Sequence, residues 1–179
     1  MTLMTPVETG VSLEALLRAK DNRAAQQAHW LTHYNNTVIS LTLVTPGEVK
    51  DSIRYRNCMG VALQACDQLF WQQSWNVLER QVTWLSTGPE ALWCVDRTAS
   101  DVKALCMQLE HTHPLGRLWD IDVFCPRQGL IGRKALGGEK RRCLLCDEPA
   151  HACARSRRHS PEQVIARVEA VIDDWFTRD

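Results

Sequence analysis

Two aspartates separated by one residue, Asp120 and Asp122, lie within the apolar run from Leu118 to Cys125. If this run is a β-strand, alternate side chains share a face, and the two carboxylates point the same way, about 6–7 Å apart along the backbone. Neighbouring carboxylates repel each other unless a cation lies between them, and Mg²⁺ prefers such oxygen ligands. Enzymes that transfer nucleotidyl groups hold a metal against a triphosphate in this way. We therefore expect Asp120 and Asp122 to bind Mg²⁺, the alternative being two solvent-facing aspartates on an edge strand.

Residues close to this pair in the sequence have side chains suited to phosphate chemistry. The strand follows a turn at Gly116-Arg117, and the guanidinium of Arg117 can contact phosphate oxygens through two hydrogen bonds. His111 and His113 precede the turn and can position phosphate or carry a proton near neutral pH, although each has a structural alternative as a hydrogen-bonding histidine. Lys50, followed by Asp51, is a further candidate for a phosphate contact. The alternative is that these two residues begin a helix, where Asp51 would interact favourably with the helix dipole.

A third carboxylate would complete a metal site of this kind. Glu110, Asp51 and Asp96 all lie next to predicted strands or turns. The spacing does not choose among them.

The chain has eight cysteines, which fall into two groups. Five are scattered among apolar neighbours and are expected to be buried as small hydrophobic residues; they are Cys58, Cys66, Cys94, Cys106 and Cys125. The other three, Cys143, Cys146 and Cys153, are followed by His159 in the spacing C-x2-C-x6-C-x5-H. Three thiolates and one imidazole would complete a tetrahedral Zn²⁺ site, with His151 as a competing fourth ligand. Metal-free loop thiols and a redox role are the alternatives.

The charge of the chain is unevenly distributed. Its 179 residues include 21 basic and 21 acidic side chains, and this balance argues against a generally basic protein that coats a nucleic acid polymer. The stretch from Arg127 to Arg158 nevertheless has nine basic and three acidic residues, a net charge of +6. Such a local positive field suits a polyphosphate ligand or an acidic protein partner, and Arg141 and Arg142 are its candidate substrate-binding residues. A solvated basic loop is the alternative.

The length is typical of one domain, and we expect a single domain over residues 1–179 with a Cys-rich basic segment at 135–159 within it. No run of about 18 apolar residues is present, so no membrane association is expected. The N-terminus has neither early basic residues nor a long apolar core, which argues against a signal peptide and for a cytoplasmic protein.

Hydrophobic periodicity predicts an α+β fold with a mixed or antiparallel sheet covered by helices. Ser12 and Ser100 are expected to cap helices, and Ser160-Pro161-Glu162-Gln163 has the features of a helix start. An irregular segment is expected after Gly137. Helices are predicted over Leu13–Trp30, Lys50–Trp71, Ser100–Leu109 and from Ser160 on, and strands over Val38–Val44, Val77–Leu85, Ala91–Val95, Leu118–Cys125 and Gly129–Arg133. Of the seven tryptophans, the core is expected to include Trp30, Trp71, Trp84 and Trp175.

Several of these motifs together resemble one known family. The segments EHTHPLGRLWDIDV (Glu110–Val123), RRCLLC (Arg141–Cys146) and CARSRRH (Cys153–His159) are closely similar to the apo-citrate lyase phosphoribosyl-dephospho-CoA transferases, and LTLVTPGEVKD (Leu41–Asp51) is also similar. The resemblance covers roughly Val38 to His159. It implies a nucleotidyltransferase-like fold and a transfer from 2′-(5″-triphosphoribosyl)-3′-dephospho-CoA to a serine of the citrate lyase acyl carrier (gamma) subunit, with release of diphosphate.

The residues identified above are compatible with that chemistry. Mg²⁺ on Asp120 and Asp122, together with Arg117 and the basic stretch, would neutralise the charge on the leaving diphosphate. An aspartate of the site or a nearby histidine, with His113 as our candidate, would accept the serine proton. His111, Gly116 and Lys50 are expected on the substrate side. Two other functions remain open: another nucleotidyltransferase, such as the malonate decarboxylase type, and a non-catalytic zinc-containing module that binds proteins.

Overall fold

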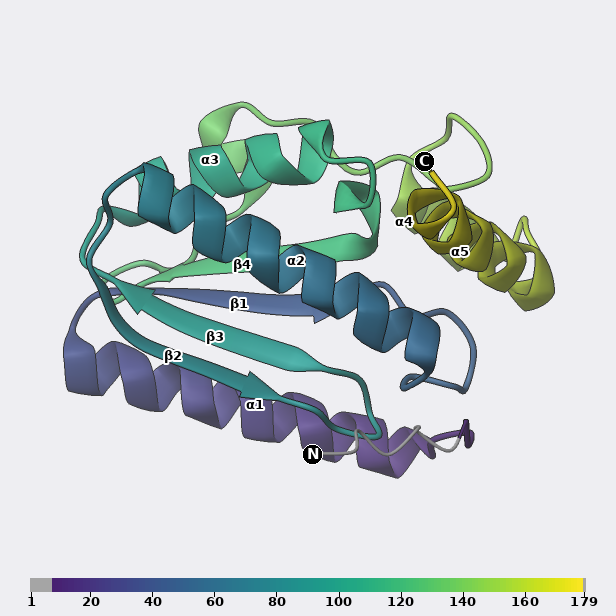
Figure 1. The fold of residues 1–179 in the computed structure, drawn as a ribbon, viewed down its shortest axis with the longest axis horizontal. Coiled ribbons are helices and arrows are strands. Elements are labelled where there is room, and N and C mark those ends of the chain that lie inside the picture. Colours follow the sequence, from purple (N-terminus) through teal and green to yellow (C-terminus); the bar gives the residue numbers. More distant parts are fainter. Residues whose placement is uncertain (1–7, 179) are drawn as a thin grey trace.

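In a computed structural model, which describes residues 8–178, the chain forms a five-stranded antiparallel sheet with helices on both faces (Figure 1). The strand order is β2-β3-β1-β4-β5. The strands are β1 (Thr37–Leu43), β2 (Val77–Thr83), β3 (Glu90–Val95), β4 (Trp119–Cys125) and β5 (Gly129–Leu130). The helices are α1 (Leu13–Tyr34), α2 (Ile53–Gln72), α3 (Ala99–Thr112), α4 (Ala150–Ser156) and α5 (Pro161–Phe176), with short 3₁₀ turns at Gly116–Leu118 and Arg133–Leu136.

The two faces of the sheet are covered by different helices. Helices α2 and α3 lie on one face, and α1 lies along the other (Figure 1). Ile39 and Leu41 of β1 belong to the large core with α2 and α3, while Val38 packs in a smaller cluster with Trp30 of α1. Alternation along each strand therefore assigns every strand side chain to one of two helical layers.

Strand β4 has an edge that β5 covers only in part, because β5 pairs with Phe124 and Cys125 alone. Nearer the start of β4, charged side chains take the place of a strand. Lys103 of α3 donates to the carbonyl oxygen of Ile121 at 2.9 Å, and Arg141 donates to that of Trp119. Charged groups of this kind protect an edge from pairing with another chain. Here Lys103 attaches α3 to β4, and Arg141 attaches the Cys-rich segment to it.

The structure confirms the α+β class, the antiparallel option for the sheet and nearly all the predicted elements. Ser12 caps α1 by accepting a hydrogen bond from the Ala15 amide at 3.1 Å, and Ser160 with Gln163 forms a capping box on α5. The predicted cap at Ser100 is wrong, because the helix already begins at Ala99. The helix α4 was not predicted.

The expectation for the tryptophans is confirmed for Trp30, which is buried, and wrong for two others. Trp71 is 81% exposed and Trp84 is 45% exposed. Trp71 follows Phe70, whose side chain is buried on the sheet side of α2, so the helical rotation turns Trp71 to solvent.

Among residues 8–178, none of the helices combines the length and the apolar character that crossing a bilayer requires. The first seven residues, where the absence of signal-peptide features was noted, lie outside the described part of the chain.

Candidate active site and metal centre

The register of β4 places Asp120 and Asp122 on the face of the sheet that α1 covers. Asp122 lies opposite Ser40 of β1, and Asp120 lies opposite Thr42. Helix α1 contacts β1 and β3, so Asp120 remains exposed and Asp122 is half-buried. Between residues 8 and 178, neither carboxylate has a hydrogen-bond or ion-pair partner.

The surroundings of the two aspartates suit a hard divalent cation. Burial, and then the charge of Asp120, raise the pKa of Asp122, while the positive charges of Lys103, Arg23 and Arg133 act in the opposite direction. The charge of Asp120 therefore disfavours the ionised form of Asp122, and a bound cation would relieve that repulsion. All the donor atoms here are oxygens, which is the set that Mg²⁺ prefers.

A small cavity of about 240 Å³ lies on the same face, beside the end of β1. Thr42, Lys20, Arg23 and Lys50 line it together with Glu90. Arg23 and Glu90 form an ion pair at 2.7 Å. Sequence reasoning missed both residues, because they lie in α1 and β3, far from the aspartate motif in the sequence.

Lys50 lines this cavity, and a hydrogen bond holds its side chain in place. Its ammonium donates to the carbonyl oxygen of Thr45, and burial lowers its pKa. Because Thr42 lies opposite Asp120 and lines the same cavity, the structure brings Lys50 to the side of the sheet that holds the aspartates.

Of the three candidates for a third carboxylate, two are engaged in ion pairs and one lies beyond the far end of β3. Glu110 is buried and pairs with Arg133 and Arg141, and Asp51 pairs with Arg56 through two hydrogen bonds. Asp96 follows the opposite end of β3 from Glu90. Glu90 is instead the acidic residue of the small cavity.

A second, larger hollow lies between α3, α5 and the Cys-rich segment, and we refer to it as the cationic cleft. It has a volume of about 800 Å³. The side chains of His111, Arg117, Arg141 and Arg142, all singled out in the sequence, line this cleft. Arg133, Lys140 and Arg167 add three more positive charges, against Glu110 and Glu139. No sequence pattern pointed to Arg167, since it belongs to the last helix, α5.

Two of the arginines in the cationic cleft hold its wall in place. Arg117 donates to the carbonyl oxygen of Arg142 through Nε at 3.1 Å and Nη2 at 2.7 Å. Arg141 donates to Trp119 and forms an ion pair with Glu110. Burial lowers the pKa of both guanidinium groups. Since Trp119 directly precedes Asp120, these contacts place the cleft next to the aspartate strand.

The structure does not bring His113 to the aspartates. Its ring packs between Trp119 and Trp175, with centroid distances of 4.4 and 4.8 Å. Its Nδ1 accepts a hydrogen bond from the Leu115 amide at 3.0 Å, and burial lowers its pKa. Trp119 points to the face opposite Asp120, so His113 lies on the wrong side of the sheet for the predicted catalytic role.

Gly116 also has a structural reason for its identity. The residue is buried, and a Cβ added there would overlap the backbone of Glu110 at the carbonyl oxygen. Only glycine allows the turn before β4 to approach α3 so closely. This packing explains Gly116 without a contact to substrate.

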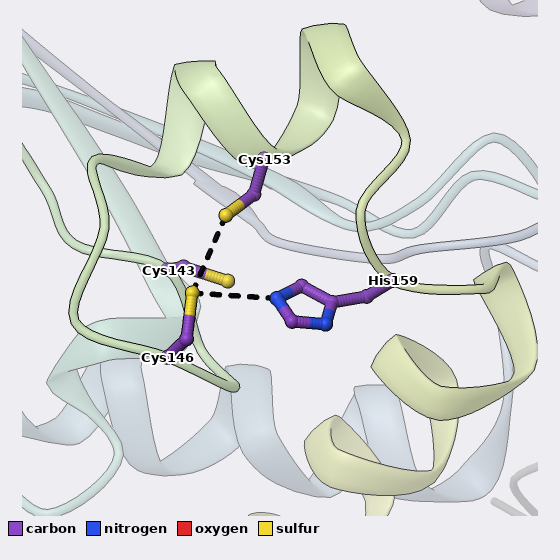
Figure 2. Close-up of side chains that lie close together, drawn as sticks. All are labelled: Cys143, Cys146, Cys153 and His159. Carbon is purple, nitrogen blue, oxygen red and sulfur yellow. Dashed lines mark hydrogen bonds between the residues drawn. The ribbon is translucent and has the colours of Figure 1, made fainter.

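The predicted cysteine cluster is assembled in the structure. Figure 2 shows Cys143, Cys146, Cys153 and His159 pointing toward one another. Their ligand atoms all lie within 4.8 Å of one another. Cys146 Sγ is 3.4 Å from Cys153 Sγ and 3.4 Å from His159 Nε2. His159, and not the exposed His151, is the fourth member.

The local backbone favours a thiolate at Cys143. Residues 141–143 and 148–150 form a tight turn, closed by hydrogen bonds from Cys143 N to Glu148 O and from Ala150 N to Arg141 O. Burial acts to raise the pKa of Cys143, but hydrogen bonds from the Leu145 and Cys146 amides and from neighbouring thiols outweigh it, and the pKa is lowered. The cluster thus has the geometry and chemistry of a metal site.

These features define a class of protein: an α+β fold with a carboxylate pair on one strand, cationic cavities beside it and a Cys₃His cluster, typical of enzymes that act on phosphorylated ligands. The chain belongs to the apo-citrate lyase phosphoribosyl-dephospho-CoA transferase family, whose model matches residues 11–175. The match confirms the family that the sequence motifs indicated, and it extends over α1 and α5.

Three curated relatives carry the name apo-citrate lyase phosphoribosyl-dephospho-CoA transferase. The protein from Shigella flexneri serotype 5b is 38% identical over 164 residues, which cover 92% of this chain and 90% of the relative. The proteins from Citrobacter koseri and Escherichia coli O1:K1 are each 37% identical over 164 residues, with the same coverage.

Proposed function

We propose that this chain transfers the phosphoribosyl-dephospho-CoA group from 2′-(5″-triphosphoribosyl)-3′-dephospho-CoA to a serine of the citrate lyase acyl carrier (gamma) subunit. Family membership over residues 11–175 supports the reaction. The structural observation that carries the proposal is the pair Asp120 and Asp122 on one sheet face, beside a cavity lined by Lys20, Arg23 and Lys50.

In this reaction the serine oxygen forms a bond to the phosphorus nearest the ribose, and the bond from that phosphorus to the diphosphate breaks. The serine proton passes to a base, and diphosphate leaves. An aspartate of the pair is the remaining candidate for that base, since His113 faces the other side of the sheet. The nucleophile belongs to the carrier, so no serine of this chain is required.

We assign Asp120 and Asp122 to Mg²⁺, because they supply adjacent oxygen ligands without a competing ion pair among the described residues. When bound, Mg²⁺ neutralises charge on the phosphates and on the departing diphosphate. Lys50 adds positive charge on the same face, whereas the charge of Arg23 is balanced by its ion pair with Glu90. A positive charge held in place in this way would stabilise the developing negative charge without reorganisation of solvent.

The donor has a second anionic group, the diphosphate of its dephospho-CoA part. We place this part in the cationic cleft, where His111, Arg142, Lys140 and Arg167 are available to it. The volume of about 800 Å³ is in the range of sites for ligands of nucleotide size. Arg117 and Arg141 support the cleft wall by their backbone contacts. Gly116 and His113 have no role in the proposal beyond packing.

The fold supports two coarser expectations. A turn with glycine followed by a strand with two aspartates favours a nucleotidyltransferase-like fold. We expect this fold to form a single domain. The eight free cysteines of the structure support a reducing, cytoplasmic location.

We also infer that the two candidate metal sites take different metals. Mg²⁺ suits the oxygen ligands of Asp120 and Asp122, whereas thiolate and imidazole ligands suit Zn²⁺. The Cys₃His cluster is therefore proposed to hold structural zinc.

The variants Asp120→Asn and Asp122→Asn test the assignment of the catalytic pair. Each is expected to leave the fold intact and to lower carrier-dependent diphosphate release by at least about a hundredfold, as is usual when a group that stabilises transition-state charge is removed. Asp101→Asn on the exposed surface of α3 is the matched control and should retain wild-type turnover.

Turnover close to wild type in both pair variants would contradict the metal assignment. A stoichiometric complex with the carrier, formed without Mg²⁺ and without diphosphate release, would instead support a non-catalytic binding module.

A further inference from the structure

We propose that zinc in the Cys₃His cluster forms one wall of the cationic cleft, so that affinity for the donor depends on this metal. The dependence on donor binding rests on the proposed function; the metal site itself does not.

Apolar burial alone holds this segment weakly. Between residues 132 and 160, Cys153 is the only buried side chain. A stretch of this length with a single buried side chain gains little hydrophobic stabilisation to offset its lost conformational freedom. Small structures with so little core usually depend on a disulfide or a metal.

The cluster has the arrangement that tetrahedral zinc requires. Zinc ligands about 2.0–2.3 Å from the ion lie roughly 3.5–4 Å from one another. The Cys146–Cys153 and Cys146–His159 distances of 3.4 Å are close to this spacing before any ion is added. The Leu145 amide also donates a hydrogen bond to Cys143 Sγ at 3.4 Å.

The four ligands come from three pieces of chain. Cys143 and Cys146 lie in the tight turn, Cys153 lies in α4, and His159 directly precedes the N-cap of α5 (Figure 2). A metal held by all four therefore fixes the turn against the start of α5.

Both of these pieces line the cationic cleft. The turn contributes Arg142 and Leu144, and α5 contributes Arg167 and Val171. Cys143 is itself a lining residue. Loss of the metal would leave the turn held by the hydrogen bonds of Arg117 and Arg141, by the ion pair of Arg141 with Glu110 and by the packing of Leu144 on the core. The turn would then no longer be fixed against α5, which contributes Arg167 to the cleft.

The experiment compares the wild-type chain with Cys146→Ser and with Cys125→Ser, a matched thiol on β4 outside the cluster. Zinc content is measured by elemental analysis, and donor affinity by calorimetry. We expect about one zinc per chain in the wild type and in Cys125→Ser, and none in Cys146→Ser. Donor affinity should fall in Cys146→Ser by roughly ten- to hundredfold, the loss of one or two charge-assisted hydrogen bonds.

Amide hydrogen exchange supplies a readout that does not depend on the donor. In Cys146→Ser, and in wild type treated with a chelator, the amides of Cys143 and Ala150 should lose protection while β1 keeps it. Folded wild-type protein without zinc, or with a disulfide in the cluster, would overturn the proposal.

A second result would also overturn the proposal: zinc is bound by the wild type and absent from Cys146→Ser, yet both bind the donor with the same affinity. The metal would then have no influence on the cleft. If the zinc-loaded wild type bound no donor at all, with zinc content and exchange as expected, the proposed function would fail and the metal site would stand.

Discussion

At the scale of single residues, neighbours in the sequence have separate roles. His113 and Asp120 are seven positions apart, yet they lie on opposite faces of the sheet. The ring of His113 packs against Trp119, whose side chain points to the face covered by α2 and α5. Arg23 and Glu90 are distant from the aspartates in the sequence and line the small cavity on the same face of the sheet. The D-x-D spacing predicted which side chains share a face, but it carried no information on which helix covers that face.

The packing of His113 predicts a pH dependence of stability. Burial lowers the folded pKa of His113 below its ordinary value of 6.5, so the unfolded chain binds more protons near that pH. The stabilisation that depends on neutral His113 is therefore lost as the pH falls through about 6.5. His113→Phe keeps an aromatic ring against Trp119 and Trp175 and removes the titration. Urea unfolding between about pH 5 and 7.5 should show a flatter profile for the variant; parallel profiles would contradict this account.

Gly116 predicts a cost of overpacking. Gly116→Ala forces a methyl group against the Glu110 backbone and should destabilise the fold by about 1–3 kcal/mol. Gly60→Ala in α2 is the matched control, since a Cβ there meets no atom within 4 Å, and it should stabilise the helix by about 0.5–1 kcal/mol. Chemical denaturation measures both. A tolerated Gly116→Ala would show that the turn and α3 can move apart.

At the scale of elements, β4 connects the two halves of the proposed site. Its α1-facing side holds Asp120 and Asp122, and its edge holds the Cys-rich segment through Arg141. The strand followed from alternation and turn residues, whereas its pairing with β1 was not predicted. The docking of the segment on the strand edge was not predicted either, because it depends on arginine contacts to backbone carbonyls that leave no pattern in the sequence.

From the contacts of Arg117 we predict how this docking affects the affinity for the donor. Arg117→Ala removes both hydrogen bonds to the Arg142 carbonyl and one positive charge from the cationic cleft. Donor affinity should fall by roughly ten- to hundredfold, while carrier affinity changes little. Arg127→Ala, in the same basic stretch but outside the cleft, should leave both affinities unchanged. Calorimetric titration with each ligand measures the difference, and an equal loss for donor and carrier would argue against a donor-specific cleft.

At the scale of the whole molecule, the chain has no net charge, but many of its positive side chains line the cationic cleft, where we place a diphosphate of the donor. The α+β class, the cysteine cluster and the family were all predictable, because each rests on local periodicity or on closely spaced residues. The cationic cleft was predictable only in part: His111, Arg117, Arg141 and Arg142 were recognised singly, while Arg167 enters from α5 through tertiary packing.

The transfer itself is tested most directly by the intact mass of the apo-citrate lyase acyl carrier subunit after incubation with this protein, Mg²⁺ and triphosphoribosyl-dephospho-CoA. The account predicts a gain equal to the mass of the donor minus diphosphate, on a serine of the carrier, and no gain when Asp120→Asn replaces the wild type. An unchanged carrier mass, with folded protein and a competent carrier, would contradict the proposed activity.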